Sequence, residues 1–158
     1  MLVLIIYDSK TGNTEKMAFA VAEGAKEIGG VDVIVKNVKK TTNEDLLQAD
    51  GIVVGSPTYY GQMSGKIKAM FDESVKVHGK LEGKVGAAFT SPGGVASGAE
   101  TTIISILEAM LVHGMIVQGR ARSGHYGAAA VGTPEERDTE RRRELGRMVA
   151  KLVLKLKT

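Results

Sequence analysis

The feature of the sequence that most constrains the fold is a series of short apolar runs without alternating polar residues. Residues 2–7 read Leu-Val-Leu-Ile-Ile-Tyr, and similar runs occupy 31–35, 51–55, 84–89 and 115–118. Strands that are buried on both faces have this pattern, which is typical of a parallel sheet covered by helices.

Between these runs, apolar residues recur every three or four positions, which predicts amphipathic helices. The faces are Met17, Val21, Ala25 and Ile28; Ile67, Met70, Phe71 and Val75; Ile103, Ile104, Leu107 and Leu111; and Leu145, Met148, Val149, Leu152, Val153 and Leu156. Helix starts are indicated at Ser97–Glu100 and Thr133–Glu136, where a hydroxyl residue precedes a glutamate by three positions. The alternation predicts an α/β protein, a three-layer α/β/α sandwich around a five-stranded parallel sheet.

The length of 158 residues favours one domain over residues 1–158. Residues 119–133 are rich in Gly and Ala and lack periodicity, so they form either a functional loop or a distorted extra strand. Residues 135–147 hold five acids and five arginines at helical spacings, such as Asp138 with Arg142 and Glu140 with Arg143. This pattern predicts a solvated, ion-paired helix face.

Composition excludes several classes of site. The chain has no cysteine, which rules out disulfides, zinc-thiolate sites, iron–sulfur clusters and a cysteine nucleophile, and no metal site is predicted. The net charge of +3 comes from three lysines in residues 151–158, so no nucleic-acid surface is expected. The sequence has neither a signal peptide nor an apolar stretch of about 18 residues, so we expect a cytoplasmic protein without membrane insertion.

Ligands of an open parallel sheet bind at the carboxyl ends of its strands. The loops there are residues 8–14, 56–64 and 90–98, all rich in Gly, Ser and Thr. The first offers hydroxyls, an amide and a glycine at the start of a helix, which favours a phosphate cradle, although a capped turn has a similar composition. It is not a Walker loop, and no G-x-G-x-x-G follows the first strand. A receiver domain is rejected because the third strand ends without an acceptor Asp.

The other two loops can form a surface for a planar ring. Tyr59 and Tyr60 beside Gly61 offer aromatic faces with close backbone approach, and Thr90–Gly94 can offer backbone amides and carbonyls. Each loop alone also fits a rigid surface turn. Three such loops at adjacent strand ends are a much stronger signal.

These loops resemble those of a known family. Ser9–Thr14 closely resembles the phosphate loop of flavodoxins, and Gly55–Gly65 is similar to the second flavin loop of WrbA-type NAD(P)H:quinone oxidoreductases. His113–Met115 and Tyr126–Ala128 also resemble that branch. The resemblance covers essentially the whole chain and implies a flavodoxin-like fold with strand order 2-1-3-4-5.

The resemblance implies FMN as the cofactor. The residues it assigns to FMN are Ser9, Lys10, Thr11, Gly12, Asn13, Thr14, Pro57, Thr58, Tyr59, Tyr60, Gly61, Thr90, Ser91, Pro92, Gly93, Gly94, Val95 and His113. The chemistry is expected on the flavin, and the resemblance implies that His113 approaches the flavin ring, which makes it the one candidate for a catalytic residue.

The resemblance also implies the partners of the flavin. The leading hypothesis is an oxidoreductase that takes electrons from NAD(P)H or a redox protein and reduces quinones or similar acceptors. The alternative is a flavodoxin-type electron carrier that is not itself an enzyme, and a scaffold that has lost its flavin is a third. A homo-oligomer is left open, because the chain is shorter than WrbA-type enzymes and has no Trp.

Overall fold

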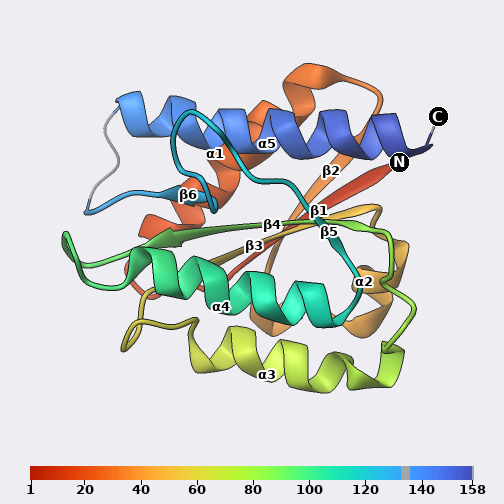
Figure 1. Ribbon diagram of the computed structural model, residues 1–158, viewed down its shortest axis with the longest axis horizontal. Coiled ribbons are helices and arrows are strands. Elements are labelled where there is room, and N and C mark those ends of the chain that lie inside the picture. The colour runs from red at the N-terminus through yellow and green to blue at the C-terminus, as the bar shows by residue number, and fades with distance from the viewer. Residues whose placement is uncertain (133–135, 158) are drawn as a thin grey trace.

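A parallel sheet forms the middle layer of the computed structural model, which describes residues 1–132 and 136–157 without the side chains of residues 136–138 (Figure 1). Its strands are β1 (Leu2–Tyr7), β2 (Asp32–Asn37), β3 (Gly51–Pro57), β4 (Val85–Ser91), β5 (Ile116–Val117) and β6 (Ala128–Ala129). The order β2-β1-β3-β4-β5 confirms the predicted topology.

The edge position next to β4 is divided between two short strands. β5 pairs with Val85 and Gly86, and β6 pairs in parallel with Phe89 and Thr90 further along the same strand. The segment between them leaves the edge of the sheet and returns at Gly127, where a Cβ would lie 2.2 Å from the Ala88 carbonyl oxygen. The described part of this segment, residues 119–132, therefore contains both a loop and a distorted extra strand.

Helices cover both faces of the sheet (Figure 1). α1 (Asn13–Ile28) and α5 (Glu136–Lys157) lie on one face, and α3 (Gly65–Glu73) and α4 (Ala99–Val112) lie on the other. A short helix, α2 (Asn43–Gln48), and two 3₁₀ turns, η1 (Val38–Lys40) and η2 (Ser74–Val77), complete the described elements. The apolar spacing did not predict α2, which begins with a capping box between Thr42 and Asp45.

The central strands are buried on both faces, as their continuous apolar runs predicted. In β1, Val3 and Ile5 pack on the side of α1 and α5, whereas Leu4 and Ile6 pack on the side of α3 and α4. Successive side chains of a strand point to opposite faces, so one apolar run supplies two cores.

The structure corrects one predicted helix start. α4 begins after Gly98, which has φ +101°, and no side chain caps its first turn. Ser97 Oγ instead donates a hydrogen bond of 2.7 Å to the Gly94 carbonyl oxygen. The second predicted start, Thr133–Glu136, lies outside the residues whose placement is described.

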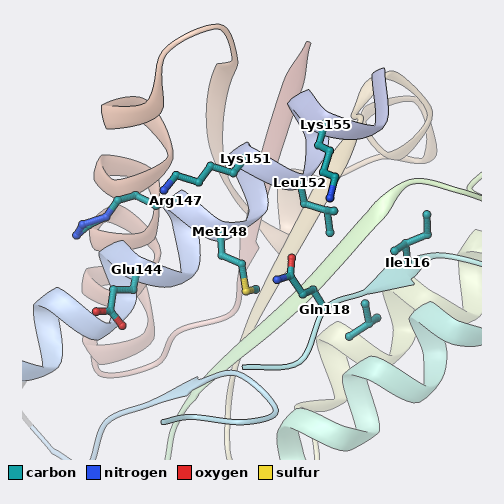
Figure 2. A pocket seen from close by; sticks show the side chains of 9 residues that line it. Ile116, Gln118, Glu144, Arg147, Met148, Lys151, Leu152 and Lys155 are labelled. Atoms are coloured by element: carbon teal, nitrogen blue, oxygen red, sulfur yellow. The ribbon is translucent and has the colours of Figure 1, made fainter. Parts of the chain in front are cut away.

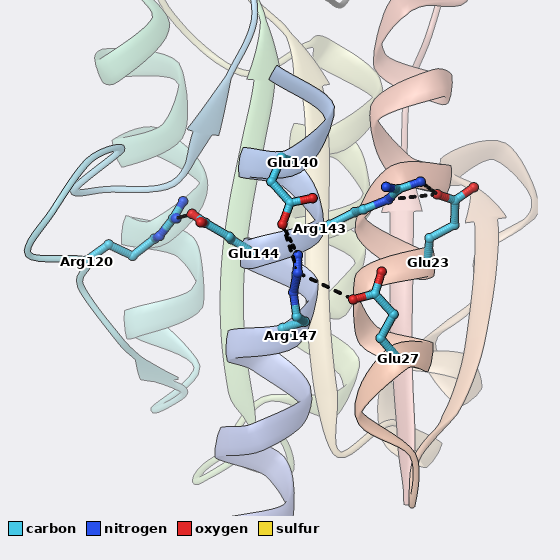
Figure 3. Close-up of polar contacts among 7 residues, drawn as sticks. All are labelled: Glu23, Glu27, Arg120, Glu140, Arg143, Glu144 and Arg147. Carbon is cyan, nitrogen blue, oxygen red and sulfur yellow. Dashed lines mark hydrogen bonds and ion pairs between the residues drawn. The ribbon is translucent and has the colours of Figure 1, made fainter. Parts of the chain in front are cut away.

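The charged run on α5 binds a neighbouring helix and is not a purely solvated face (Figure 3). Arg143 pairs with Glu23 of α1 at 2.7 Å, and Glu140 pairs with Arg147, so the expected Glu140–Arg143 pair does not form. Arg142 is buried in the core-facing side of α5. The side chain of Asp138, its expected partner, is not described.

Candidate functional site

The loops that follow β1, β3 and β4 meet at the carboxyl edge of the sheet, at the left of Figure 1. They enclose a cavity of about 380 Å³. The predicted residues that line it are Lys10, Thr11, Asn13, Thr14, Pro57, Thr58, Tyr59, Ser91, Pro92 and Gly93. Three segments that are far apart in the sequence therefore form one site, as the sequence predicted.

The first loop leaves hydrogen-bond donors free at the start of α1. Gly12 has φ +93° and donates its N–H to Ser9 Oγ at 3.0 Å, and no side chain caps the helix. The first backbone bond of the helix runs from the Lys16 N–H to the Gly12 carbonyl oxygen at 3.0 Å. The amides of residues 13–15 thus lack partners within the helix, and together with the helix dipole they form a site that fits an anion such as a phosphate.

A hydroxyl pair joins the first loop to the third. Thr14 Oγ1 and Ser91 Oγ lie 2.6 Å apart, and Thr14 is buried. This hydrogen bond connects the first turn of α1 to the end of β4, so the anion site and the third loop are held in one position. The cradle therefore has both the donors and the support that a phosphate group needs.

The second loop is a tight turn with an exposed aromatic ring. Tyr59 and Gln62 exchange two backbone hydrogen bonds of 3.0 Å, and Tyr60 and Gly61 at the corner have φ 49° and 74°. A positive φ at both corner positions is usual for Gly or Asn and strained for Tyr. Tyr60 is fully exposed, so no packing within the described chain explains the aromatic side chain at this position.

The third loop rests on a buried threonine. Thr90 Oγ1 donates to the Ser56 carbonyl oxygen at 2.7 Å, so the Thr58 hydroxyl at 2.9 Å must donate to Thr90. Through these two hydrogen bonds Thr90 holds the second loop against the third, and it does not line the cavity. The predicted residues that belong to the three loops but lie outside the lining are Ser9, Gly12, Tyr60, Gly61, Thr90, Gly94 and Val95. Gly132 lines the cavity, and no sequence pattern indicated it.

The structure corrects the expectation for His113. α4 begins beside the second loop, where a Cβ on Gly98 would lie 2.7 Å from Gly61 Cα, and it runs about 21 Å along its axis to the opposite edge of the sheet. A helix that connects two parallel strands returns to their amino ends, so His113 at its end is far from the three loops.

His113 instead belongs to a buried polar pair. It is 7% exposed, and its Nε2 lies 2.7 Å from Ser74 Oγ. Ser74 Oγ donates to the Phe71 carbonyl oxygen, so Nε2 carries the proton of the His113–Ser74 bond and Nδ1 has no partner among the described residues. Burial and the neighbouring His78 hold the pKa of His113 below its ordinary value of 6.5.

A larger groove lies elsewhere, between β5 and α5 (Figure 2). Its volume is about 680 Å³, and Met148 and Leu152 of α5 point into it together with Gln118 (Figure 2). None of the three glycine-rich loops lines this groove. Its β5 residues pair with the amino end of β4, away from the carboxyl ends of the strands. Residue chemistry therefore favours the smaller cavity as the functional site.

Comparisons with known proteins agree with this geometry. Residues 37–127 match the model of the NADPH-dependent FMN reductase family. A flavodoxin of Aquifex aeolicus is 43% identical over 96% of this chain and 86% of its own length. An NAD(P)H dehydrogenase (quinone) of Archaeoglobus fulgidus is 38% identical over 98% of each chain.

Among solved structures, a WrbA-like flavodoxin from Agrobacterium tumefaciens superposes with a TM-score of 0.84 at 26% identity, over 98% of both chains. No helix in the described part of the chain is long and apolar enough to cross a membrane. The family model spans more than half of the chain and the relatives match nearly all of it, so this chain belongs to the NADPH-dependent FMN reductase family of flavodoxin-like, FMN-binding proteins.

Proposed function

We propose that this protein is an FMN-dependent oxidoreductase that takes electrons from NAD(P)H and passes them to a quinone or a similar acceptor. The observation that carries the proposal is the uncapped start of α1, held against the third loop by the Thr14–Ser91 hydrogen bond in the cavity that Tyr59 also lines. The names of the family and of the Archaeoglobus relative support the nicotinamide donor and the quinone acceptor.

In this proposal the first loop binds the FMN phosphate. The amides of residues 13–15 and the hydroxyls of Thr11 and Thr14 supply donors, and Lys10 adds a positive charge in the wall of the cavity, while Ser9 Oγ accepts from the Gly12 N–H and supports the loop. One terminal phosphate fits this single cradle, whereas the pyrophosphate of FAD has to continue outward to an adenosine site.

The second and third loops hold the flavin ring. Tyr59 lies in the wall of the cavity together with Pro92, Gly93 and Ser91, and Ser91 is bonded to Thr14 of the phosphate loop. Tyr60 keeps an aromatic side chain in a strained, exposed conformation, and strain of this kind clusters at ligand sites. We infer that Tyr60 covers part of the flavin ring or of a substrate stacked on it.

The three loops would bind and orient the cofactor and exclude water, and a bound flavin would supply the two-electron hydride chemistry. His113 takes no part, because it lies at the opposite edge of the sheet. The chain has no cysteine, so no thiol competes for electrons.

An anaerobic titration of the flavin-loaded protein with NADPH and with NADH tests the function. We expect bleaching of the visible flavin band by one equivalent of nucleotide and recovery of the band on addition of a quinone. The second candidate is an electron carrier, which the flavodoxin name of the Aquifex relative favours. Reduction by dithionite but by neither nucleotide would decide for the carrier.

A substitution in the cradle tests the site. Thr14→Ala removes a buried hydroxyl, and we expect FMN binding to weaken by about 10- to 100-fold, the range for a lost hydrogen bond to a charged group. Thr41→Ala is the matched control, because Thr41 Oγ1 bonds to the Asn37 carbonyl oxygen outside the cavity. Equal FMN affinities in the two variants would show that the loop is only a turn.

The identity of the cofactor is tested separately. Chromatography after denaturation should recover FMN, and recovery of FAD would overturn the choice of a single phosphate cradle. A cytoplasmic location and a single domain over residues 1–158 stay predictions from the sequence.

A further inference from the structure

A second cavity lies behind the third loop, between the first turn of α4 and the segment 118–127. Its volume is about 230 Å³, and its walls include two arginines, Arg120 and Arg141, together with His125 and Tyr126. We propose that this cavity binds the adenosine 2′-phosphate end of NADPH. The proposal rests on the proposed function, since it extends the flavin site to the far end of its electron donor.

The second cavity is lined by segments that adjoin the site of the three loops. Ala99 in its wall directly follows the third loop, and Ala129 of β6 lies three residues before Gly132, which lines the first cavity. The Ala130 N–H donates to the Thr90 carbonyl oxygen at 3.3 Å, which joins the strand that carries Ala129 to the end of β4, where Ser91 lines the first cavity. A dinucleotide whose nicotinamide lies on the flavin can therefore place its other end here.

The wall formed by segment 118–127 is internally bonded. The Arg120 N–H donates to the His125 carbonyl oxygen at 3.1 Å, and His125 Nδ1 donates to the Arg120 carbonyl oxygen at 2.7 Å. The Arg120 guanidinium reaches from this segment to Glu144 on α5 (Figure 3). These contacts hold the arginine in place, and they leave His125 Nε2 as the ring nitrogen available to a ligand.

The charges favour an anion on one side of the cavity. Arg120 is compensated by Glu144, whereas Arg141 makes no ion pair with any residue of the described chain. A guanidinium is well suited to a phosphate because it offers several fixed N–H donors. Glu100, at the opposite wall on α4, is the acid that faces the same space, and its charge opposes a phosphate.

An aromatic ring completes the cavity. Tyr126 is half-exposed in the wall and is not part of the buried core, so its ring can stack on a purine. A base beside a phosphate is the chemistry of an adenosine 2′-phosphate. A simple carboxylic acid would bind to Arg141 but would leave the Tyr126 ring without a partner.

Calorimetric titration of the flavin-loaded protein with 2′,5′-ADP, and with 5′-AMP for comparison, tests the proposal. We expect 2′,5′-ADP to bind more tightly than 5′-AMP, and Arg141→Gln to weaken its binding by about tenfold or more. Arg122→Gln is the control, because Arg122 is exposed on the same segment but lies outside the lining of the cavity. Glu100→Gln should tighten binding, because it removes the opposing charge.

The readouts separate the inference from the proposed function. Arg141→Gln should raise KM for NADPH but not for NADH, with unchanged FMN content. Equal binding of 2′,5′-ADP by the Arg141→Gln and Arg122→Gln variants, or equal affinities for 2′,5′-ADP and 5′-AMP, would overturn the inference while the function stands. If 2′,5′-ADP binds as expected but neither nucleotide reduces the flavin, the site is supported and the proposed enzyme is wrong.

Discussion

The two helix layers of this protein are packed in different ways. In the layer of α1 and α5, the helices touch through their backbones: a Cβ on Gly24 would lie 2.0 Å from the Arg143 carbonyl oxygen, and a Cβ on Gly146 would lie 1.9 Å from that of Val21. Two ion pairs, Glu23–Arg143 and Glu27–Arg147, border this contact (Figure 3). Small residues let the two helices approach much closer than ordinary side chains allow.

The layer of α3 and α4 leaves apolar side chains uncovered. Val75 is 69% exposed, Leu111 58% and Val112 72%. One of its buried polar contacts is the bond between Ser74 and His113, and a hollow of about 420 Å³ lies beside it. Where α1 and α5 touch through their backbones, this layer has the Ser74–His113 pair and a hollow beside it.

Each layer carries one end of the proposed flavin site. The phosphate cradle is the first turn of α1, so the closely packed layer fixes the cofactor's anchor. The second loop precedes α3 and the third loop precedes α4, so the more open layer carries the groups proposed to surround the flavin ring. We infer that one layer anchors the cofactor and the other controls access of the substrate. Substitutions in each layer test this inference.

The largest effect is expected for Gly146→Ala. The new Cβ would overlap the Val21 carbonyl oxygen, so α5 would have to move away from α1, and we expect a loss of about 3 kcal/mol in the free energy of unfolding. Gly65→Ala in α3 is the control, because no atom lies within 4 Å of the added Cβ. It should leave stability unchanged or raise it by up to about 1 kcal/mol. Similar losses in both variants, measured by urea unfolding, would contradict the close contact.

The next effect is expected in the other layer, for Ser74→Ala. This change leaves His113 Nε2 buried without its partner, and we expect a loss of about 1–3 kcal/mol in the free energy of unfolding. Ser97→Ala removes a serine whose hydrogen bonds are at the surface and should cost less. FMN affinity should not change in Ser74→Ala, because Ser74 and His113 lie away from the cavity. A weakened FMN affinity would contradict this and would mean that His113 affects the flavin site.

The same pair makes stability depend on pH. The pKa of His113 is lower in the folded protein than in the unfolded chain, so between the two values the unfolded chain binds more protons. Stability should therefore be complete above about pH 6.5 and fall as the pH is lowered, by at most about 1.4 kcal/mol per pH unit for one group. His113→Gln should remove this part of the slope, whereas the exposed His125→Gln should keep it. An unchanged slope in His113→Gln would assign the effect to other groups.

The sequence predicted the features that depend on local pattern. Continuous apolar runs identified the central strands because those residues are buried on both faces, and the hydroxyl and glycine residues of 9–14 predicted a loop that the structure places at the cavity, where phosphate binding stays a prediction. The position of His113 was wrong because the motif gave the helix end but not the edge of the sheet at which it lies. The contact at Gly24 and Gly146 was missed because a glycine within a helix shows its function only when the partner helix is known.

The smallest effect is expected for the ion pairs beside that contact. Arg147 pairs with Glu27 of α1 at 3.4 Å and with Glu140 of its own helix, and both acids are largely solvated. Arg147→Gln should therefore lower the free energy of unfolding by only about 0.5–1 kcal/mol. The difference from wild type should shrink in 1 M salt, because salt screens charges near the surface. Lys151→Gln, one turn further along α5 and without an ion pair among the described residues, should have no measurable effect. A loss for Arg147→Gln as large as that for Gly146→Ala would mean that charge holds this layer together, and not the close approach of the two backbones.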